Sequence, residues 1–78
     1  NPFNPVTKIK YDVPLKGVFV KLIIYDLLGR EVATLVNAQL QPGTYEAVWN
    51  ASNQPSGVYL YTLTAGEYRE TKKMILLK

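Results

Sequence analysis

Residues 58–68, with the sequence VYLYTLTAGEY, decide the fold class of this chain. The run Val58–Thr64 is rich in tyrosine and threonine, which favour strands. Its alternation places every second side chain from Tyr59 to Leu63 on one face, as expected for a half-buried strand. Gly66-Glu67 suits the two-residue type II′ turn of a hairpin. Tyr68–Leu77 is then expected to return, as one strand or as two short ones.

Strand-like runs and turn signals alternate along the rest of the chain, with a turn about every 8 to 14 residues. Asp26–Arg30 suits a hairpin loop, with Gly29 in the left-handed conformation. Asn37–Gly43, closed by a type II turn, and Ala51–Gly57 are expected to be loops. No window is both amphipathic and long enough for a helix. The remaining strands are expected at Val6–Val13, Val18–Tyr25, Glu31–Val36 and Thr44–Asn50.

This pattern predicts an all-β sandwich or barrel of six to seven antiparallel strands. Residues 1–78 are expected to form one domain, because so short a chain builds a single core. Residues 1–5, NPFNP, are expected to be an irregular lead-in, since each proline restricts itself and the residue before it. Trp49 is the one tryptophan and the expected anchor of the core. The other inward side chains are expected to be Ile9, Tyr11, Val13, Val20, Leu22, Ile24, Val32, either Leu35 or Val36, Tyr45 and Ala47.

The composition excludes several kinds of function. The 78 residues contain neither histidine nor cysteine, which removes a thiol nucleophile, a histidine base, disulfides and the usual zinc ligands. Most of the 6 acidic residues lie at turns or on polar strand faces, so no catalytic carboxylate pair is expected. The chain is therefore predicted to be non-catalytic and to hold no cofactor.

Metal, nucleic-acid and membrane partners also have weak support. Asp26 or residues 50–53 could offer oxygen ligands to a calcium-like ion, but these residue types also serve turns and no metal site is expected. The net charge of +3 is mild, and acidic residues interrupt the lysines, so no nucleic-acid partner is expected. The apolar stretch 18–28 is broken by Lys21 and Asp26, so no membrane insertion is expected.

Two binding roles remain open as alternatives. Tyrosines can stack on sugar rings, which would suit an accessory carbohydrate-binding module; the candidates are Tyr11, Tyr25, Tyr61 and Tyr68. The apolar last strand and the Asn-Pro lead-in would instead suit a structural subunit of an extracellular filament that assembles by strand donation or exchange. The segment Lys72–Lys78, KKMILLK, has two interpretations. It is either an ordinary closing strand whose flanking lysines oppose aggregation, or an edge that a receptor binds by strand addition.

Four segments carry a family resemblance. They are NPFNP at 1–5, YDLLGREV at 25–32, SGVYLY at 56–61 and TKKMILLK at 71–78. In this order and spacing they resemble the type A C-terminal sorting domain of the type IX secretion system of Bacteroidetes and related phyla. The hairpin is also similar to one in the immunoglobulin-like domain of flagellar hook-capping proteins.

The resemblance implies a small Ig-like antiparallel β-sandwich of about seven strands, located at the C-terminus of a secreted protein. In this family the N-terminal cargo crosses the inner membrane by its own signal. The outer-membrane translocon then recognises the domain and exports the cargo from the periplasm to the cell surface, where a sortase commonly removes the domain. Since the chain begins at Asn1 rather than at a methionine, it is expected to be a piece of a longer protein or a processed product. By the resemblance, the translocon-recognition residues are Gly57, Val58, Tyr59, Lys72, Lys73, Met74, Ile75, Leu76, Leu77 and Lys78. Asp26, Gly29 and Arg30 form a structural signature, to which we add Trp49.

Overall fold

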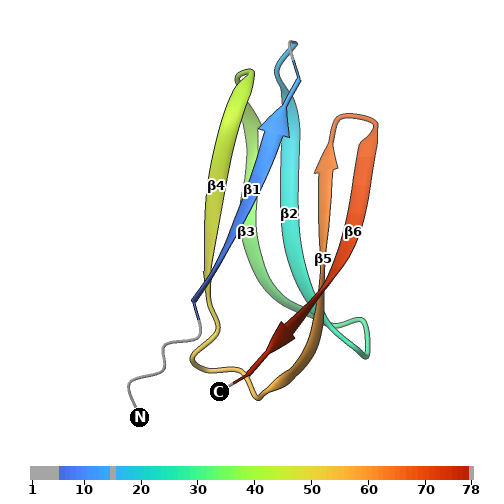
Figure 1. Cartoon of the computed structure of the whole chain (residues 1–78). Helices are drawn as coiled ribbons and strands as arrows, with labels where there is room; N and C mark the ends of the chain where they lie inside the picture. Colours follow the sequence, from blue (N-terminus) through green and yellow to red (C-terminus); the bar gives the residue numbers. More distant parts are fainter. Residues whose placement is uncertain (1–5, 15, 78) are drawn as a thin grey trace.

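The computed structural model describes residues 6–14 and 16–77, and the regular structure in this part of the chain is entirely β-strand (Figure 1). The expected lead-in at residues 1–5 and the recognition residue Lys78 lie outside the described residues. The strands are β1 (Val6–Val13), β2 (Val18–Asp26), β3 (Glu31–Leu40), β4 (Gly43–Asn50), β5 (Gly57–Ala65) and β6 (Tyr68–Leu76). Among the described residues there is no helix that could cross a membrane.

The strands form two antiparallel sheets that pack as the layers of a sandwich (Figure 1). The small sheet contains β1 and β4, and the large sheet has the order β3-β2-β5-β6. The all-β sandwich predicted from the sequence is therefore confirmed, with six strands rather than about seven in the described part. The small sheet covers only part of the large one because it has two strands against four.

The hairpin predicted at the end of the chain is present. Ala65 lies opposite Tyr68, and Gly66 has a φ of 64°. Non-glycine residues with positive φ are absent from the described part of the chain, so Glu67 has negative φ, as the second position of a type II′ turn requires. The returning strand β6 is continuous rather than broken in two.

The loop expected at Asn37–Gly43 is wrong over its first four residues. β3 continues to Leu40, where Asn37 to Leu40 pair with Lys21 to Val18 of β2. Backbone pairing with β2 outweighs the polar character of Asn37 and Gln39, whose side chains are exposed. The type II turn expected at Pro42-Gly43 is also absent, because Gly43 has a φ of 152° instead of about 80°.

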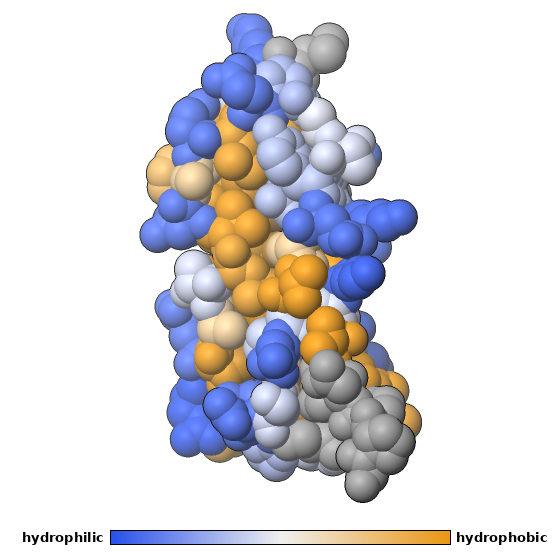
Figure 2. Space-filling view, turned by 90° about the vertical axis from the view of Figure 1, so that its left-hand side faces the viewer, coloured by the Kyte–Doolittle hydropathy of each residue, from blue (hydrophilic) through white to orange (hydrophobic). Residues whose placement is uncertain are grey.

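The core lies between the two sheets and confirms most of the predicted inward residues. Val20, Leu22 and Ile24 of β2 are fully buried, and Trp49 of β4 is only 5% exposed. Tyr45 and Tyr61 are half-buried and pack against this core. Figure 2 shows an apolar strip along the side on which β3 and β4 lie in Figure 1. The half-buried side chains of Val32, Leu35 and Val36 of β3 also pack against the core.

Candidate functional site

The two segments predicted for translocon recognition are direct neighbours on adjacent strands. Gly57 lies opposite Leu76, Val58 opposite Ile75, and Tyr59 opposite Met74. Lys72 and Lys73 follow on β6, opposite Tyr61 and Leu60. The structure therefore brings these residues together at one end of two paired strands, which we call the β5–β6 site and define as residues 57–59 and 72–77.

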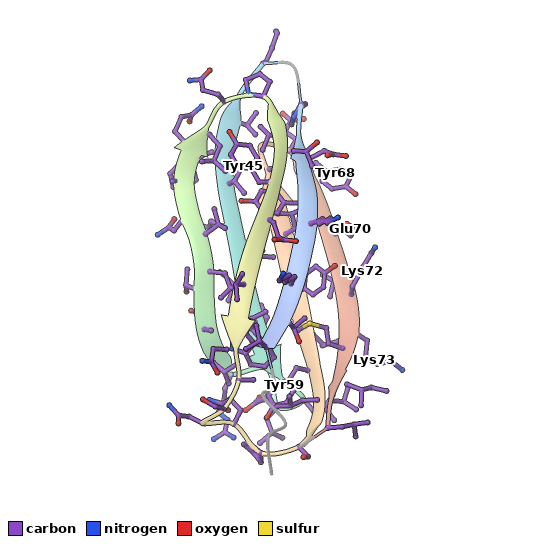
Figure 3. All side chains as sticks on the ribbon, turned by 60° about the vertical axis from the view of Figure 1, so that its left-hand side comes forward. Tyr45, Tyr59, Tyr68, Glu70, Lys72 and Lys73 are labelled. Atoms are coloured by element: carbon purple, nitrogen blue, oxygen red, sulfur yellow. The ribbon has the colours of Figure 1, made fainter. Side chains whose placement is uncertain are left out.

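The β5–β6 site has an inner half that belongs to the core. Tyr59 and Leu76 are 4% and 5% exposed, and Met74 is half-buried. The ring of Tyr59 meets Trp49 edge to face, with ring centroids 5.2 Å apart, and the Tyr59 hydroxyl donates a 2.6 Å hydrogen bond to the carbonyl oxygen of Pro55. Tyr59 thus joins the two sheets and holds the loop before β5, which is a structural role (Figure 3).

The outer half of the site faces away from the small sheet. Because side chains alternate along a strand, Val58 and Ile75 lie together on the opposite face from Tyr59. Ile75 is 66% exposed and Leu77, just after β6, is 69% exposed. Lys73 is exposed on the same face as Ile75. These four side chains form an apolar and basic surface that a partner can contact.

Lys72 belongs to the inner face but lies at its uncovered margin. Tyr68, Glu70 and Lys72 follow one another at alternate positions along β6 (Figure 3). The ammonium of Lys72 is 3.7 Å from a carboxylate oxygen of Glu70. Tyr68 and Glu70 line an open groove of about 400 Å³ between β1 and β6, together with Lys10 and Asp12 of β1. Charged groups therefore occupy the strip of the inner face that the small sheet leaves open.

The signature hairpin lies at the same end of the large sheet, since Asp26 is opposite Tyr59. The Asp26 carboxylate accepts hydrogen bonds from the backbone N–H groups of Leu28 and Arg30, at 2.9 and 3.0 Å, and from Nε of Arg30 at 2.8 Å. Gly29 has a φ of 86°, and its N–H donates to the carbonyl of Asp26 at 3.0 Å. The Asp26 carboxylate therefore closes the hairpin, and the predicted left-handed Gly29 is confirmed.

The hairpin tip carries two residues that sequence reasoning passed over. Leu27 and Leu28 are 67% and 79% exposed. Turn chemistry does not require leucine at either position, so this pair was the available signal for an apolar surface at this end. Leu27 directly follows Asp26, which lies opposite Tyr59 of β5.

The candidate sugar-binding tyrosines do not gather on one surface. Tyr11 is buried and stacks on Tyr45 with ring centroids 5.6 Å apart, and burial raises the pKa of its hydroxyl. Tyr25 and Tyr61 are half-buried on opposite faces of the large sheet. Tyr68, at 55% exposed, is the most accessible of the four.

The hydrogen bonds that Asp26 accepts in the hairpin should make the stability of the domain depend on pH. The backbone N–H of Arg30 is the main cause that holds the pKa of Asp26 below its ordinary value, helped by the Arg30 side chain and opposed by partial burial. A proton therefore binds the unfolded chain more readily. The stabilisation is present above about pH 4 and is lost as the pH falls through the lowered pKa.

Replacing Asp26 with asparagine should lower the urea midpoint more at pH 7 than at pH 2, because the stabilisation by the charge is lost as the pH falls through the lowered pKa of Asp26. Urea unfolding followed by Trp49 fluorescence measures this. Asp12→Asn, at an exposed carboxylate that accepts a hydrogen bond from Thr44 Oγ1 on a different strand, is the matched control for the hairpin. An equal loss at both pH values would show that the charge of Asp26 is not what stabilises the hairpin.

Comparison with known proteins identifies the family of this chain. Searches among curated proteins and among solved structures find no match. The family model described as secretion system C-terminal sorting domain matches residues 1–77. This match spans both strands of the β5–β6 site and the signature hairpin, so the chain belongs to the family of C-terminal sorting domains that carry the signal for type IX secretion.

Proposed function

We propose that this domain directs an N-terminal cargo through the type IX outer-membrane translocon to the cell surface, and that the outer half of the β5–β6 site is what the translocon contacts. Family membership implies the type IX machinery as partner, an attached cargo, and a secreted or cell-surface protein. The pairing of Gly57–Tyr59 with Met74–Leu76 carries the proposal, because it places Val58 of one segment beside Ile75 of the other on the outer face.

In this proposal the recognition residues divide into two roles. Val58, Lys73, Ile75 and Leu77 contact the translocon. Tyr59 and Leu76 are buried, so they act by holding β5 and β6 in place. The domain works as a non-catalytic address, and a surface sortase then separates it from the cargo.

Export of a fused periplasmic reporter tests the proposal. Residues 1–78 should carry the reporter outside a type IX-competent cell, and deletion of residues 72–78 should retain it in the periplasm. Ile75→Glu should reduce export about tenfold or more without unfolding the domain, since a charge would enter an apolar contact. Val48→Glu is the matched control, because Val48 is a 53% exposed strand valine on the small sheet.

Two results would contradict the proposal. Unchanged export after the deletion would show that the end of β6 is not recognised. Equal loss of export with Ile75→Glu and Val48→Glu, both folded by circular dichroism, would show that export depends on general surface properties rather than on the β5–β6 site.

A further inference from the structure

Among the described residues, the outer backbone edge of β6 has no neighbouring strand. This strand is the last of the large sheet in the part of the chain that the structure describes, and it pairs with β5 on its other side. In an antiparallel pair, alternate residues direct their N–H and C=O groups away from the partner strand. About half of the nine residues of β6 therefore offer hydrogen-bonding groups to a further strand.

The side chains along this edge are basic first and apolar afterwards. Lys72 and Lys73 lie in the middle of β6, whereas exposed Ile75 and Leu77 lie at its end. Glu70 approaches Lys72, but the cross-strand neighbour of Lys73 is Leu60, which has no charge. The edge thus complements a segment that has carboxylates opposite the lysines and apolar residues opposite Ile75 and Leu77.

A second copy of β6 does not fit this edge. Full antiparallel overlap of two β6 strands around a two-fold axis would place Lys72 directly opposite Lys72 of the other copy. A shift by two residues, the smallest step that keeps the inner faces aligned, would place Lys73 opposite Lys73 in one direction. In the other direction it would place Lys73 opposite Arg69 of the other copy, and Lys72 opposite Glu70. Like charges directly opposite each other destabilise a strand pair, so each of these three registers contains at least one repulsive pair.

Insertion of a strand into the open groove is also disfavoured. The inner margin of β6 carries Glu70 and Lys72, which remain partly exposed as an ion pair. A strand laid over them would remove both charges from water, and desolvation of an ion pair can exceed its attraction. Addition at the edge of β6 leaves this inner face open to solvent.

We propose that the free edge of β6 binds an extended segment of a partner protein, in which two adjacent acidic residues lie opposite Lys72 and Lys73 and apolar residues lie opposite Ile75 and Leu77. The added strand extends the large sheet. Backbone hydrogen bonds supply affinity, and the acidic and apolar positions supply specificity. The proposed function enters this inference at one point, since it assigns the partner protein to the type IX machinery. The binding chemistry of the edge is argued independently of it.

Two synthetic peptides test this chemistry in solution. The probe Thr-Val-Thr-Val-Thr-Glu-Glu-Thr, aligned antiparallel to β6, places its valines opposite Leu77 and Ile75 and its glutamates opposite Lys73 and Lys72. The control peptide has two lysines in place of the glutamates. Fluorescence anisotropy should show roughly tenfold tighter binding of the acidic peptide at low salt, because two cross-strand pairs change from repulsive to attractive. The difference should shrink at high salt.

Charge reversal in the chain supplies the matching variant. Lys72→Glu with Lys73→Glu should reverse the preference between the two peptides, and Lys73→Glu alone should remove most of it if the double variant fails to fold. Lys21→Glu is the control, because Lys21 is an exposed lysine on β2, between Asn37 and Thr64, on the same outer face but away from the edge. This control should leave the preference unchanged.

The location of binding is measured by amide hydrogen exchange, which should slow in β6. The proposal would be overturned if both peptides bound equally, or if Lys21→Glu altered the preference as much as Lys73→Glu. It would also be overturned if protection were confined to β1 or β4, or if the domain sedimented as a dimer at the same concentrations. These measurements use no translocon. Their failure would leave the export experiment unaffected, and retained binding with failed export would contradict the proposed function alone.

Discussion

Trp49→Ala should destabilise the domain by about 3–5 kcal/mol, as expected for removal of a large buried aromatic side chain. Trp49 is 5% exposed and meets Tyr59 of the large sheet edge to face. A domain of 78 residues has a total stability of only about 4–12 kcal/mol at ordinary values per residue. The substitution should therefore leave a large unfolded fraction at 37 °C, measured by far-ultraviolet circular dichroism during thermal and urea unfolding.

Two controls separate the sheet-to-sheet contact from the mere loss of a side chain. Trp49→Phe keeps an apolar ring and should cost less than half as much as alanine. Val48→Ala changes the adjacent, outward-facing residue of the same strand and should stay within about 0.5 kcal/mol of the parent, as surface substitutions usually do. A loss below about 1 kcal/mol for Trp49→Ala would show that other residues suffice to hold the small sheet.

The strands and their inward faces were predictable because they depend on local alternation. Ile9 and Val13 in β1 and Leu22 in β2 are buried as expected, and the glycines at the two hairpins, Gly29 and Gly66, have the positive φ that their turns require. The position of Trp49 followed from its size and from its place in an alternating run. Each of these features is encoded within a few neighbouring residues.

The pairing of strands was not predictable in the same way. β1 pairs with β4 and β2 with β5 across long separations in the chain, and no local pattern specifies which edges meet. The continuation of β3 to Leu40 was missed for this reason. The polar residues Asn37 and Gln39 suggest a loop when they are considered alone. In the structure they pair with Lys21 and Phe19 of β2, and this pairing extends β3 as a strand of the large sheet.

The geometry of the β5–β6 site could have been obtained from the sequence. The two-residue turn at Gly66-Glu67 fixes Ala65 opposite Tyr68, and counting outward from this pair brings Gly57 opposite Leu76. The division into a buried and an exposed half also follows from alternation once Tyr59 is known to face Trp49. What the sequence could not supply was the two-strand width of the small sheet, which leaves Glu70 and Lys72 uncovered.

Gly17→Ala is expected to have the second largest effect on stability, about 2–4 kcal/mol. Gly17 has a φ of 36°, and a Cβ atom there would lie 2.9 Å from the carbonyl oxygen of Leu40. The left-handed conformation alone costs roughly 1–2 kcal/mol for a residue with a Cβ atom. The clash adds to this, because the obstructing oxygen belongs to the backbone and cannot move aside as a flexible side chain would. The urea midpoint measures the loss.

Gly29→Ala is the control that separates the cost of a left-handed backbone conformation from the cost of a steric clash. Gly29 also has positive φ, at 86°, but apart from its two neighbours in the chain a Cβ atom there would meet no atom within 4 Å. It should therefore lose only the conformational term of roughly 1–2 kcal/mol. The Cβ of Gly17 would also approach Gln41 and Pro42, at 3.6 Å, so the connection from β1 to β2 touches that from β3 to β4. Equal losses of stability for the two variants would mean that the backbone near Gly17 shifts at little cost to admit a Cβ atom. A larger loss for Gly17→Ala would show that the β1–β2 and β3–β4 connections pack closely through their backbones.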